Sequence, residues 1–305
     1  MAVVEAVEGL AGKFRGSMAG ALMGDCLGAP FEGESRASRS VLNSYFRRLA
    51  DPALKVPYKL YTDDTAMTRC VAQSLIDEKG YCATDMAKKF VKEYYNEPKR
   101  GYGSNVTDVF AALRATKFQD VYAPAGIQFG GRGSYGNGAA MRIAPVALFC
   151  YDAPDKEVVH IAKDSSLLTH ANRLGYNGAV LQKLEKLLEL MEQGDSVTPS
   201  QVEDTLGVYI SAHMSVPTAI YSFIRALNPV TNIESDNAFL RTIHYAISLG
   251  GDTDTIASMA GSIAGAYYGF SEIPESFHRH CEALSDAIEQ ADQLFKMRKP
   301  KSTET

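Results

Sequence analysis

The stretch FRGSMAGALMGDCLG, residues 14–28, indicates how the centre of this protein is built. Apolar side chains recur in it every four positions, at Phe14, Met18 and Leu22, which is typical of one face of a helix. Glycine recurs with the same spacing, at Gly16, Gly20, Gly24 and Gly28. A second stripe of small residues occurs near the end of the chain, at Ala257, Gly261 and Gly265. Because small side chains let backbones approach closely, we expect both helices to pack tightly against neighbours in the centre of the fold.

Helical spacing continues along most of the chain, whereas alternating strand patterns are scarce. Beyond the helices containing Phe14, Met67 and Met86, the pattern predicts helices over Val106–Leu113, Ala139–Phe149, Glu157–Leu168, Gly178–Met191, Ser200–Ala212, Ala219–Leu227, Asn237–Leu249, Asp254–Tyr268 and Glu275–Met297. The sequence therefore predicts an all-α fold of roughly a dozen helices. Because no Pro/Gly/Ser-rich linker divides it, we expect one compact domain over residues 1–305, with a frayed polar tail at residues 298–305.

Charge and composition argue against several classes of protein. The formal net charge of −5 and the pI near 5.7 give no basic field, so we expect no direct binding to duplex nucleic acid. The longest stretches without Asp, Glu, Lys or Arg are interrupted by polar residues or rich in Gly and Ala, so we expect no membrane span. Five widely spaced cysteines and a first segment unlike a secretory signal favour an intracellular, reducing compartment.

Two short motifs combine carboxylates with hydroxyls directly before apolar helical runs. They are Tyr-Thr-Asp-Asp-Thr at Tyr61–Thr65 and Gly-Gly-Asp-Thr-Asp-Thr at Gly250–Thr255. Either motif alone is explained by an Asp that caps a helix and faces the positive end of its dipole. If the fold brings the motifs together, four carboxylates cannot all stay ionised without cations between them. Because both motifs offer only oxygen ligands, the pair favours Mg²⁺, Mn²⁺ or Ca²⁺ over Zn²⁺ and suggests a magnesium site.

A glycine-rich segment at residues 126–138 supplies a second chemical signal, directly before an apolar run. Glycines let backbone N–H groups approach a phosphate, and the N-terminus of a helix favours an anion. Phe129 and Tyr135 offer rings on which a base can stack. The segment matches neither the Walker lysine motif nor a GxGxxG that follows a strand. A flexible loop is therefore the alternative, and Arg132 is equally well explained as a solvated charge or as a phosphate ligand.

Two single residues also have ordinary explanations. His170 lies between two helical runs, where a histidine is more often a capping or packing residue than a ligand. Glu32 follows Gly24-Asp25 in a loop, where an exposed glutamate without a function is the default. If the two small-residue helices pack centrally, the loops Asp25–Glu34 and Gly250–Thr255 line one cleft.

Six segments resemble, in order along the chain, the ADP-ribosylglycohydrolase family. They are Gly24-Asp25 with Glu32, Tyr61–Met67, Gly133–Arg142, Gly175–Ala179, Ser215–Tyr221 and Gly250–Thr255. The resemblance runs from about Phe14 to the region of Glu275, which covers most of the chain, and the two aspartate motifs with the glycine-rich loop are specific as a set. Ser215–Tyr221 and the Tyr61 motif are more similar to the branch that acts on serine linkages than to the branch that acts on arginine linkages.

The resemblance implies a compact all-α domain with two Mg²⁺ ions at the base of a central cleft. It implies metal ligation by Glu32, Thr62, Asp63, Asp64, Asp252, Asp254 and Thr255. It implies catalytic roles for Glu32, Asp63 and Asp64. It implies substrate binding by Asp63, Phe129, Arg132, Gly133, Ser134, Tyr135, Gly136, Asn137, Gly138 and His170.

The activity implied by the resemblance is hydrolysis of O-glycosidic bonds at the anomeric carbon of ADP-ribose. The implied substrates are ADP-ribosyl-serine on proteins, poly(ADP-ribose) and O-acetyl-ADP-ribose. Such an enzyme is expected to be a monomer in the nucleus, the cytoplasm and the mitochondrial matrix. The alternatives are a catalytically silent, crystallin-like or ADP-ribose-binding relative and an arginine-linkage hydrolase.

Two segments depart from the family pattern. The chain turns within Gly194–Thr198, where vertebrate members carry a longer insertion, so any adenosine contact made there is missing or replaced. Glu34 offers a carboxylate that competes with Glu32, and the spacing from Asp25 favours Glu32.

Overall fold

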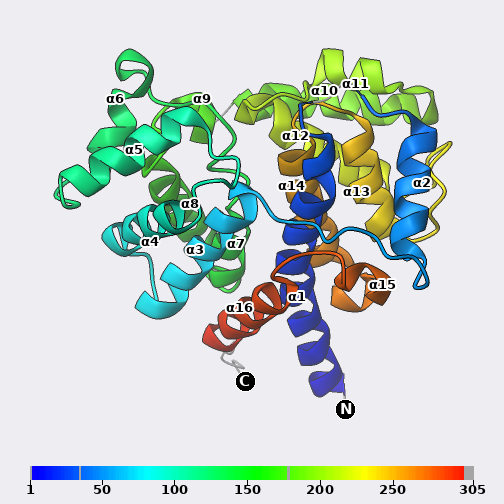
Figure 1. The fold of residues 1–305 in the computed structure, drawn as a ribbon, viewed down its shortest axis with the longest axis horizontal. Helices are drawn as coiled ribbons and strands as arrows, with labels where there is room; N and C mark the ends of the chain where they lie inside the picture. Colours follow the sequence, from blue (N-terminus) through cyan, green and yellow to red (C-terminus); the bar gives the residue numbers. More distant parts are fainter. Residues whose placement is uncertain (1, 34–35, 177–178, 299–305) are drawn as a thin grey trace.

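Helices make up nearly all of the regular structure in the computed structural model, which describes residues 2–33, 36–176 and 179–298 (Figure 1). Between the named helices of these residues, only two isolated β-bridges occur, Lys59 with Cys281 and Gly136 with Ser211. The all-α prediction is therefore confirmed. Residues 299–305 of the expected tail and the expected helix start at residue 178 lie outside the described residues.

Two long antiparallel helices form the centre of the molecule (Figure 1). They are α1 (Ala2–Gly28) and α14 (Thr253–Tyr268). A Cβ atom added to Gly20 would overlap the carbonyl oxygen of Gly261, and one added to Gly28 would lie 2.6 Å from the carbonyl oxygen of Thr253. The backbones of α1 and α14 therefore touch along the glycine stripe. The prediction of tight central packing is confirmed, and the structure shows that the two striped helices are each other's partner.

The end of α1 meets the beginning of α14 because the two helices run in opposite directions. The hydroxyl of Thr253 donates a hydrogen bond of 3.0 Å to the carbonyl of Gly28. The backbone N–H of Gly33 donates one of 3.1 Å to the carbonyl of Gly251. These bonds bring the loop that follows Gly24-Asp25 beside the loop that precedes α14, as the small-residue stripes predict.

The remaining helices lie in two groups around this pair (Figure 1). On one side are α3 (Asp63–Glu78), α4 (Ala83–Asn96), α5 (Ser104–Ala115), α6 (Ala123–Gly131), α7 (Ala144–Phe149), α8 (Asp155–Leu167) and α9 (Arg173–Tyr176). On the other are α2 (Arg39–Ala50), α10 (Ala179–Gln193), α11 (Pro199–Thr205), α12 (Ala212–Arg225) and α13 (Ala238–Ser248). The last elements are α15 (Glu275–His278) and α16 (Leu284–Met297), and three short 3₁₀ helices are η1 (Ala29–Phe31), η2 (Gly194–Ser196) and η3 (Phe270–Glu272). One cluster of buried apolar side chains connects both groups to the central pair, so the molecule is a single compact domain.

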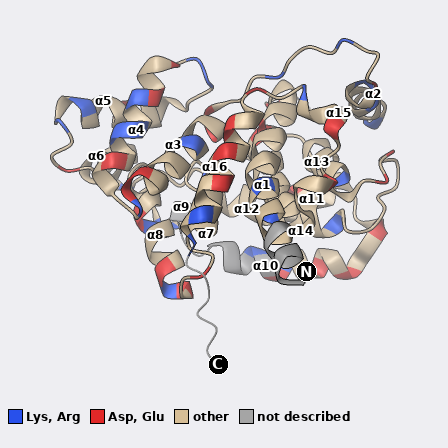
Figure 2. Ribbon diagram, turned by 90° about the horizontal axis from the view of Figure 1, so that it is seen from below, with Lys and Arg blue, Asp and Glu red and all other residues tan. Residues whose placement is uncertain are grey.

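Charged side chains are interspersed along the helices, and acidic residues are prominent on α16 (Figure 2). Two of them pair with basic residues of neighbouring helices, Asp292 with Arg15 of α1 at 2.6 Å and Asp286 with Arg69 of α3 at 2.7 Å. These ion pairs orient α16 across the centre of the fold. No helix in the described part of the chain is both long enough and apolar enough to cross a membrane.

Four expected helices are wrong at their ends or interrupted. The range Ala219–Leu227 belongs to α12, which already begins at Ala212, because the helix accommodates Pro217 in its interior, and which ends at Arg225. The range Ala139–Phe149 begins with turns, and its helix starts only at Ala144, with proline in the first turn, where its missing N–H costs no helical hydrogen bond. The range Ser200–Ala212 ends at Thr205, because Gly207 adopts a φ of 91° and the chain turns away.

The fourth range, Glu275–Met297, is divided into α15 and α16. The backbone N–H of Lys59 donates a hydrogen bond of 2.7 Å to the carbonyl of His280, and the carbonyl of Lys59 accepts one of 2.9 Å from the N–H of Glu282. Ala283 then adopts a left-handed φ of 57°. Pairing with a segment distant in the sequence therefore takes these backbone groups out of the helix, which local periodicity does not reveal.

We predict that Gly20→Ala destabilises the protein strongly, because the added methyl group has no space against the backbone of α14. The expected loss in the free energy of unfolding is about 3 kcal/mol, measured by urea denaturation. Gly12→Ala is the matched control, since a Cβ added there meets nothing within 4 Å. This control should be as stable as the wild type or up to ~1 kcal/mol more stable. Equal stability of the two variants would show that α1 and α14 do not touch in solution.

Candidate functional site

The candidate site is a cavity of about 340 Å³ at the place where α1, α3 and α14 meet. Most of the residues expected at a site line it: Glu32, Asp63, Asp64, Phe129, Ser134, Tyr135, Gly136, Asn137, Gly138, His170, Asp252, Asp254 and Thr255. Three of the expected residues do not line it: Thr62, Arg132 and Gly133. Several lining residues were not expected: Met67, Gly101, Gly103, Asn105, Val106, Gln128, Met141 and Ile210.

Asp25 is a structural part of the site that the sequence did not identify. Its carboxylate is fully buried and accepts hydrogen bonds from the backbone N–H and the hydroxyl of Thr62, at 3.1 and 2.9 Å, and from the N–H of Thr65 at 3.0 Å. These N–H groups lie at the N-terminus of α3, where backbone N–H groups have no carbonyl partner within the helix. Asp25 thereby caps α3 from α1 and sets the position of the first aspartate motif. Its place directly after Gly24 in the stripe is the signal that could have identified it.

The two aspartates of the first motif lie in the first turn of α3. Asp64 is buried, and its Oδ2 accepts a hydrogen bond of 3.0 Å from the hydroxyl of Thr255. This bond joins the two aspartate motifs, so they lie together as a shared cation site requires. The Oδ1 of Asp64 is also buried and has no hydrogen-bond partner among the described residues. A buried oxygen without a donor is costly unless a cation or another group satisfies it.

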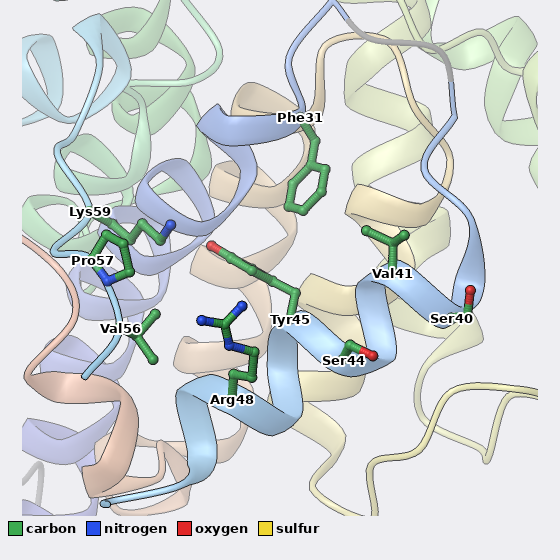
Figure 3. A pocket seen from close by; sticks show the side chains of 9 residues that line it. All are labelled: Phe31, Ser40, Val41, Ser44, Tyr45, Arg48, Val56, Pro57 and Lys59. Atoms are coloured by element: carbon green, nitrogen blue, oxygen red, sulfur yellow. The ribbon is translucent and has the colours of Figure 1, made fainter. Parts of the chain in front are cut away.

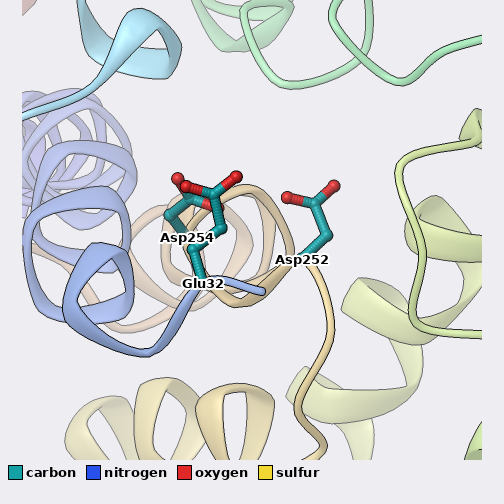
Figure 4. Close-up of side chains that lie close together, drawn as sticks. All are labelled: Glu32, Asp252 and Asp254. Carbon is teal, nitrogen blue, oxygen red and sulfur yellow. The ribbon is translucent and has the colours of Figure 1, made fainter. Parts of the chain in front are cut away.

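Glu32, Asp252 and Asp254 bring three carboxylates together at the start of α14 (Figure 4). One oxygen from each lies within 4.8 Å of the others, so this group could hold a metal ion. Asp252 also accepts a hydrogen bond of 2.5 Å from the side-chain amide of Asn137, which donates to the hydroxyl of Ser215 at 3.0 Å. Asn137 therefore positions a carboxylate of this cluster as well as lining the cavity.

Burial and mutual repulsion raise the pKa values of these acids. Burial raises the pKa of Asp63 to about 7, and the charge of Asp25 adds to it. Burial, followed by the charge of Asp252, raises the pKa of Asp254 to about 10. The pKa of Asp64 is raised well above its usual value by burial and by the charge of Asp254. The pKa of Glu32 is raised by partial burial of its carboxyl group and by the charge of Asp252.

The same arrangement fits a divalent cation. All side chains that face one another at the two motifs offer oxygen atoms, which are the ligands that hard cations such as Mg²⁺ and Ca²⁺ prefer. A cation among them would satisfy the unpaired oxygen of Asp64 and remove the repulsion that favours protonation. Thr62 has a different position, because its hydroxyl donates to Asp25.

The glycine-rich loop forms another part of the cavity lining. It is attached to the segment before α12 by two backbone hydrogen bonds, from Asn137 N–H to the carbonyl of Ile210 at 2.8 Å and from Ala212 N–H to the carbonyl of Tyr135 at 3.1 Å. A Cβ atom added to Gly138 would lie 2.8 Å from the ring of His170. Glycine is therefore needed there for the loop to pack against that histidine.

Two aromatic rings lie at the rim of the cavity. The ring centroids of Phe129 and Tyr135 are 5.9 Å apart, and both side chains are partly exposed, at 38% and 46%. Arg132 is exposed, and its Nε donates a hydrogen bond of 3.1 Å to the carbonyl of Phe129. Its guanidinium therefore contacts its own loop, and a role in binding phosphate stays a prediction.

A second hollow, of about 520 Å³, is larger than the acidic cavity (Figure 3). It lies beside α2 and is lined by Phe31, Ser40, Val41, Ser44, Tyr45, Arg48, Val56, Pro57 and Lys59. Its charged groups are the two cations of Arg48 and Lys59, so it offers no carboxylate to a metal ion. The chemistry of the lining, rather than the volume, therefore identifies the acidic cavity as the candidate site.

This chain is similar to known proteins over nearly its whole length. The family model described as ADP-ribosylglycohydrolase matches residues 7–184 and 180–304. A chicken (Gallus gallus) protein named ADP-ribosylhydrolase ARH3 is 42% identical, and its human (Homo sapiens) counterpart is 40% identical, each over 93% of both chains. A solved chain of an ADP-ribosylglycohydrolase-related protein complex has the same fold, with a TM-score of 0.66 and 23% identity over 95% of this chain and 99% of that one. The chicken alignment spans 344 positions, more than the 305 residues here, so that relative contains residues without a counterpart in this chain.

We predict that Mg²⁺ stabilises the protein, and more so at pH 8 than at pH 5.5. A carboxyl whose folded-state pKa is raised, such as that of Asp63 at about 7, stabilises the fold at low pH, and this contribution is lost as the pH rises through that value. A bound cation reverses the effect because it favours the ionised form. The melting temperature should rise by about 5 °C at pH 8 with Mg²⁺ in large excess.

Asp63→Asn combined with Asp252→Asn should abolish this rise at both pH values. The matched control is Asp152→Asn combined with Asp236→Asn, which changes two exposed aspartates outside the cavity. It should respond to Mg²⁺ as the wild type does. A response that persists in the first double variant, or that is larger at pH 5.5, would contradict a cation site at these carboxylates.

Proposed function

Because the chain belongs to the ADP-ribosylglycohydrolase family, we propose that it is a Mg²⁺-dependent hydrolase of O-glycosidic bonds at the anomeric carbon of ADP-ribose. The observation that carries this proposal is the cavity itself. Its lining combines the carboxylates of α3 and α14 with a glycine-rich loop attached to the start of α12. Such a cavity combines a place for cations with a place for phosphates, which ADP-ribose requires.

In this proposal five carboxylates and two threonines hold two Mg²⁺ ions. The ligands are Glu32, Thr62, Asp63, Asp64, Asp252, Asp254 and Thr255. When bound, the metal supplies Lewis-acid contacts that orient the hydroxyls of the distal ribose. Thr62 contributes mainly through Asp25, since its hydroxyl already donates to that buried carboxylate.

The diphosphate lies against the glycine-rich loop. The backbone N–H groups of Gly133, Gly136 and Asn137 already donate within the protein. The proposed donors to the phosphates are therefore the backbone N–H groups of Ser134, Tyr135 and Gly138, which line the cavity, and glycine allows the close approach that a phosphate needs. The adenine stacks at the rim on Phe129 and Tyr135, whose rings are already paired. Arg132 adds positive charge at the same rim.

The reaction is the attack of water on the anomeric carbon. The C–O bond to the serine oxygen breaks as the bond to water forms, and the leaving oxygen takes up a proton. Two carboxylates that line the cavity are suited to move this proton, Glu32 and Asp63, while Asp64 and its neighbours stabilise the positive charge that develops on the sugar. Glu32 lies on the loop that follows α1 and is the better candidate, because its exposure lets it reach both metal and substrate.

The proposed substrates are ADP-ribosyl-serine on proteins, poly(ADP-ribose) and O-acetyl-ADP-ribose. Support comes from relatives named ADP-ribosylhydrolase ARH3 that are 37–42% identical over most of this chain. Ser215 lies in the segment that resembles the serine-linkage branch, and its hydroxyl accepts a hydrogen bond from the side-chain amide of Asn137. The same amide donates to Asp252. An arginine-linkage hydrolase is the second candidate. We propose a monomer that acts in the nucleus, the cytoplasm and the mitochondrial matrix and does not bind duplex nucleic acid.

A catalytically silent relative that only binds ADP-ribose is the rival from another class. Such a protein would be free to lose carboxylates from the metal site. All six of the expected aspartate, glutamate and threonine ligands other than Thr62 line one cavity here, which favours the enzyme.

We predict that Glu32→Gln lowers kcat on a serine-linked ADP-ribosyl peptide by about 10² to 10⁴-fold. Affinity for ADP-ribose should change much less, because a proton-transferring carboxylate acts mainly on the transition state. Steady-state kinetics and calorimetric titration measure the two quantities. Glu34→Gln is the control, and it should keep nearly full activity; residue 34 lies outside the described residues. An active Glu32→Gln beside an inactive Glu34→Gln would transfer the role to Glu34.

A further inference from the structure

We infer that Arg142 and Thr169 hold His170 in a single tautomer, with its proton on Nε2, so that the cavity contains a permanent N–H donor. In the proposed function, on which the ligand part of this inference rests, that donor recognises a phosphate or ribose oxygen of ADP-ribose. Arg142 and Thr169 are then positioning residues, since they act on the ligand only through His170.

Arg142 is a buried cation, with 1% of its surface exposed. Its Nη2 donates to the carbonyl of Ser165 at 3.0 Å and to the hydroxyl oxygen of Thr169 at 2.9 Å. Its guanidinium lies 4.6 Å from the ring centroid of Phe90, and it forms no ion pair with a carboxylate among the described residues. Because a guanidinium has donors and no acceptor, the direction of the bond to Thr169 is certain.

The hydrogen bond from Arg142 determines how Thr169 can bond to the histidine. Its hydroxyl is completely buried, and its oxygen lies 2.7 Å from Nδ1 of His170. A hydroxyl has one proton and two lone pairs, and one lone pair already accepts from Arg142. If Nδ1 carried a proton, the hydroxyl proton would have no acceptor among the described residues, which is unfavourable for a buried group. The arrangement that satisfies every group has Thr169 donating to an unprotonated Nδ1.

The other nitrogen of His170 faces the glycine-rich loop. A Cβ atom added to Gly138 would lie 3.1 Å from Nε2, and one added to Gly136 would lie 3.3 Å from it. All three residues line the acidic cavity, and Nε2 has no hydrogen-bond partner among the described residues. With Nδ1 unprotonated, a neutral ring must carry its proton on Nε2. The free N–H is therefore available to an acceptor that enters the cavity.

The ring also stays neutral at physiological pH. Burial, followed by the nearby charge of Arg142, lowers the pKa of His170 to about 3. A fixed neutral donor binds an anionic oxygen without a change of protonation. It differs in this respect from an exposed histidine, whose donor and acceptor nitrogens exchange roles with tautomer and pH.

The tautomer can be measured without any ligand. In protein labelled with ¹⁵N-histidine, the two ring nitrogens of His170 give separate resonances, which are assigned by their loss in His170→Gln. Over pH 6–8 we expect Nδ1 in the unprotonated range and Nε2 in the protonated range. A protonated Nδ1, a doubly protonated ring or fast exchange between tautomers would overturn the inference.

Two substitutions of Thr169 test the consequence for binding. Thr169→Val keeps the shape of the side chain and removes the hydroxyl, whereas Thr169→Ser keeps the hydroxyl. By calorimetry, ADP-ribose should bind about tenfold more weakly to Thr169→Val and nearly as well as to the wild type in Thr169→Ser. The Mg²⁺-induced rise in melting temperature should be the same in all three proteins, which shows that the metal site is intact.

Equal affinities of the wild type and Thr169→Val, or equal losses in both variants, would overturn the role of the hydroxyl. A wild type that binds no ADP-ribose at all would instead overturn the proposed function. In that event the ¹⁵N resonances still decide whether Arg142 and Thr169 hold the tautomer.

Discussion

The contact between the backbones of α1 and α14 is the constraint on which the rest of the structure depends. Glycine at Gly20 and Gly261 removes the side chains that would separate the two helices. Their antiparallel course then places the end of one beside the beginning of the other, and Thr253 closes the junction by its hydrogen bond to Gly28. Through this junction, loops separated by more than two hundred residues supply a single cavity. A helix pair held apart by larger side chains would not bring Glu32 to Asp252 and Asp254.

Electrostatic repulsion among the carboxylates at this junction explains why they favour protons or a cation. Burial and like charge raise the pKa of Asp63 to about 7 and that of Asp254 to about 10. Without a cation, protonation therefore relieves the repulsion between neighbouring carboxylates. Asp25 differs from its neighbours, because three donors from Thr62 and Thr65 satisfy it within the protein. It therefore acts as a structural anchor for α3, while the unpaired oxygen of Asp64 is free for a cation. One carboxylate therefore builds the site, and the others are the proposed ligands of a cation.

Local patterns in the sequence predicted what depends on local physics. The glycine stripes predicted close packing, and the helical spacing predicted an all-α domain, but the identity of the packing partners needed the structure. The helix α2 was missed although Leu42, Phe46 and Leu49 have helical spacing and are buried. The break between α15 and α16 could not be read from the sequence, because it arises from backbone pairing with Lys59. Cavity residues such as Gly101 and Ile210 likewise carry no chemical signal, since only the fold brings them to the site.

The most direct measurement of the central claim is the release of ADP-ribose by the purified full-length chain, from a serine-linked and an arginine-linked ADP-ribosyl peptide, each with Mg²⁺ and after removal of metal. If the junction of α1, α3 and α14 is a cation-dependent hydrolase site for O-linked ADP-ribose, release occurs from the serine peptide only, and only with Mg²⁺. Release that is independent of metal would contradict the role given to the carboxylates. Equal release from the arginine peptide would contradict the choice of linkage, and no release from either peptide would contradict the proposed hydrolase activity.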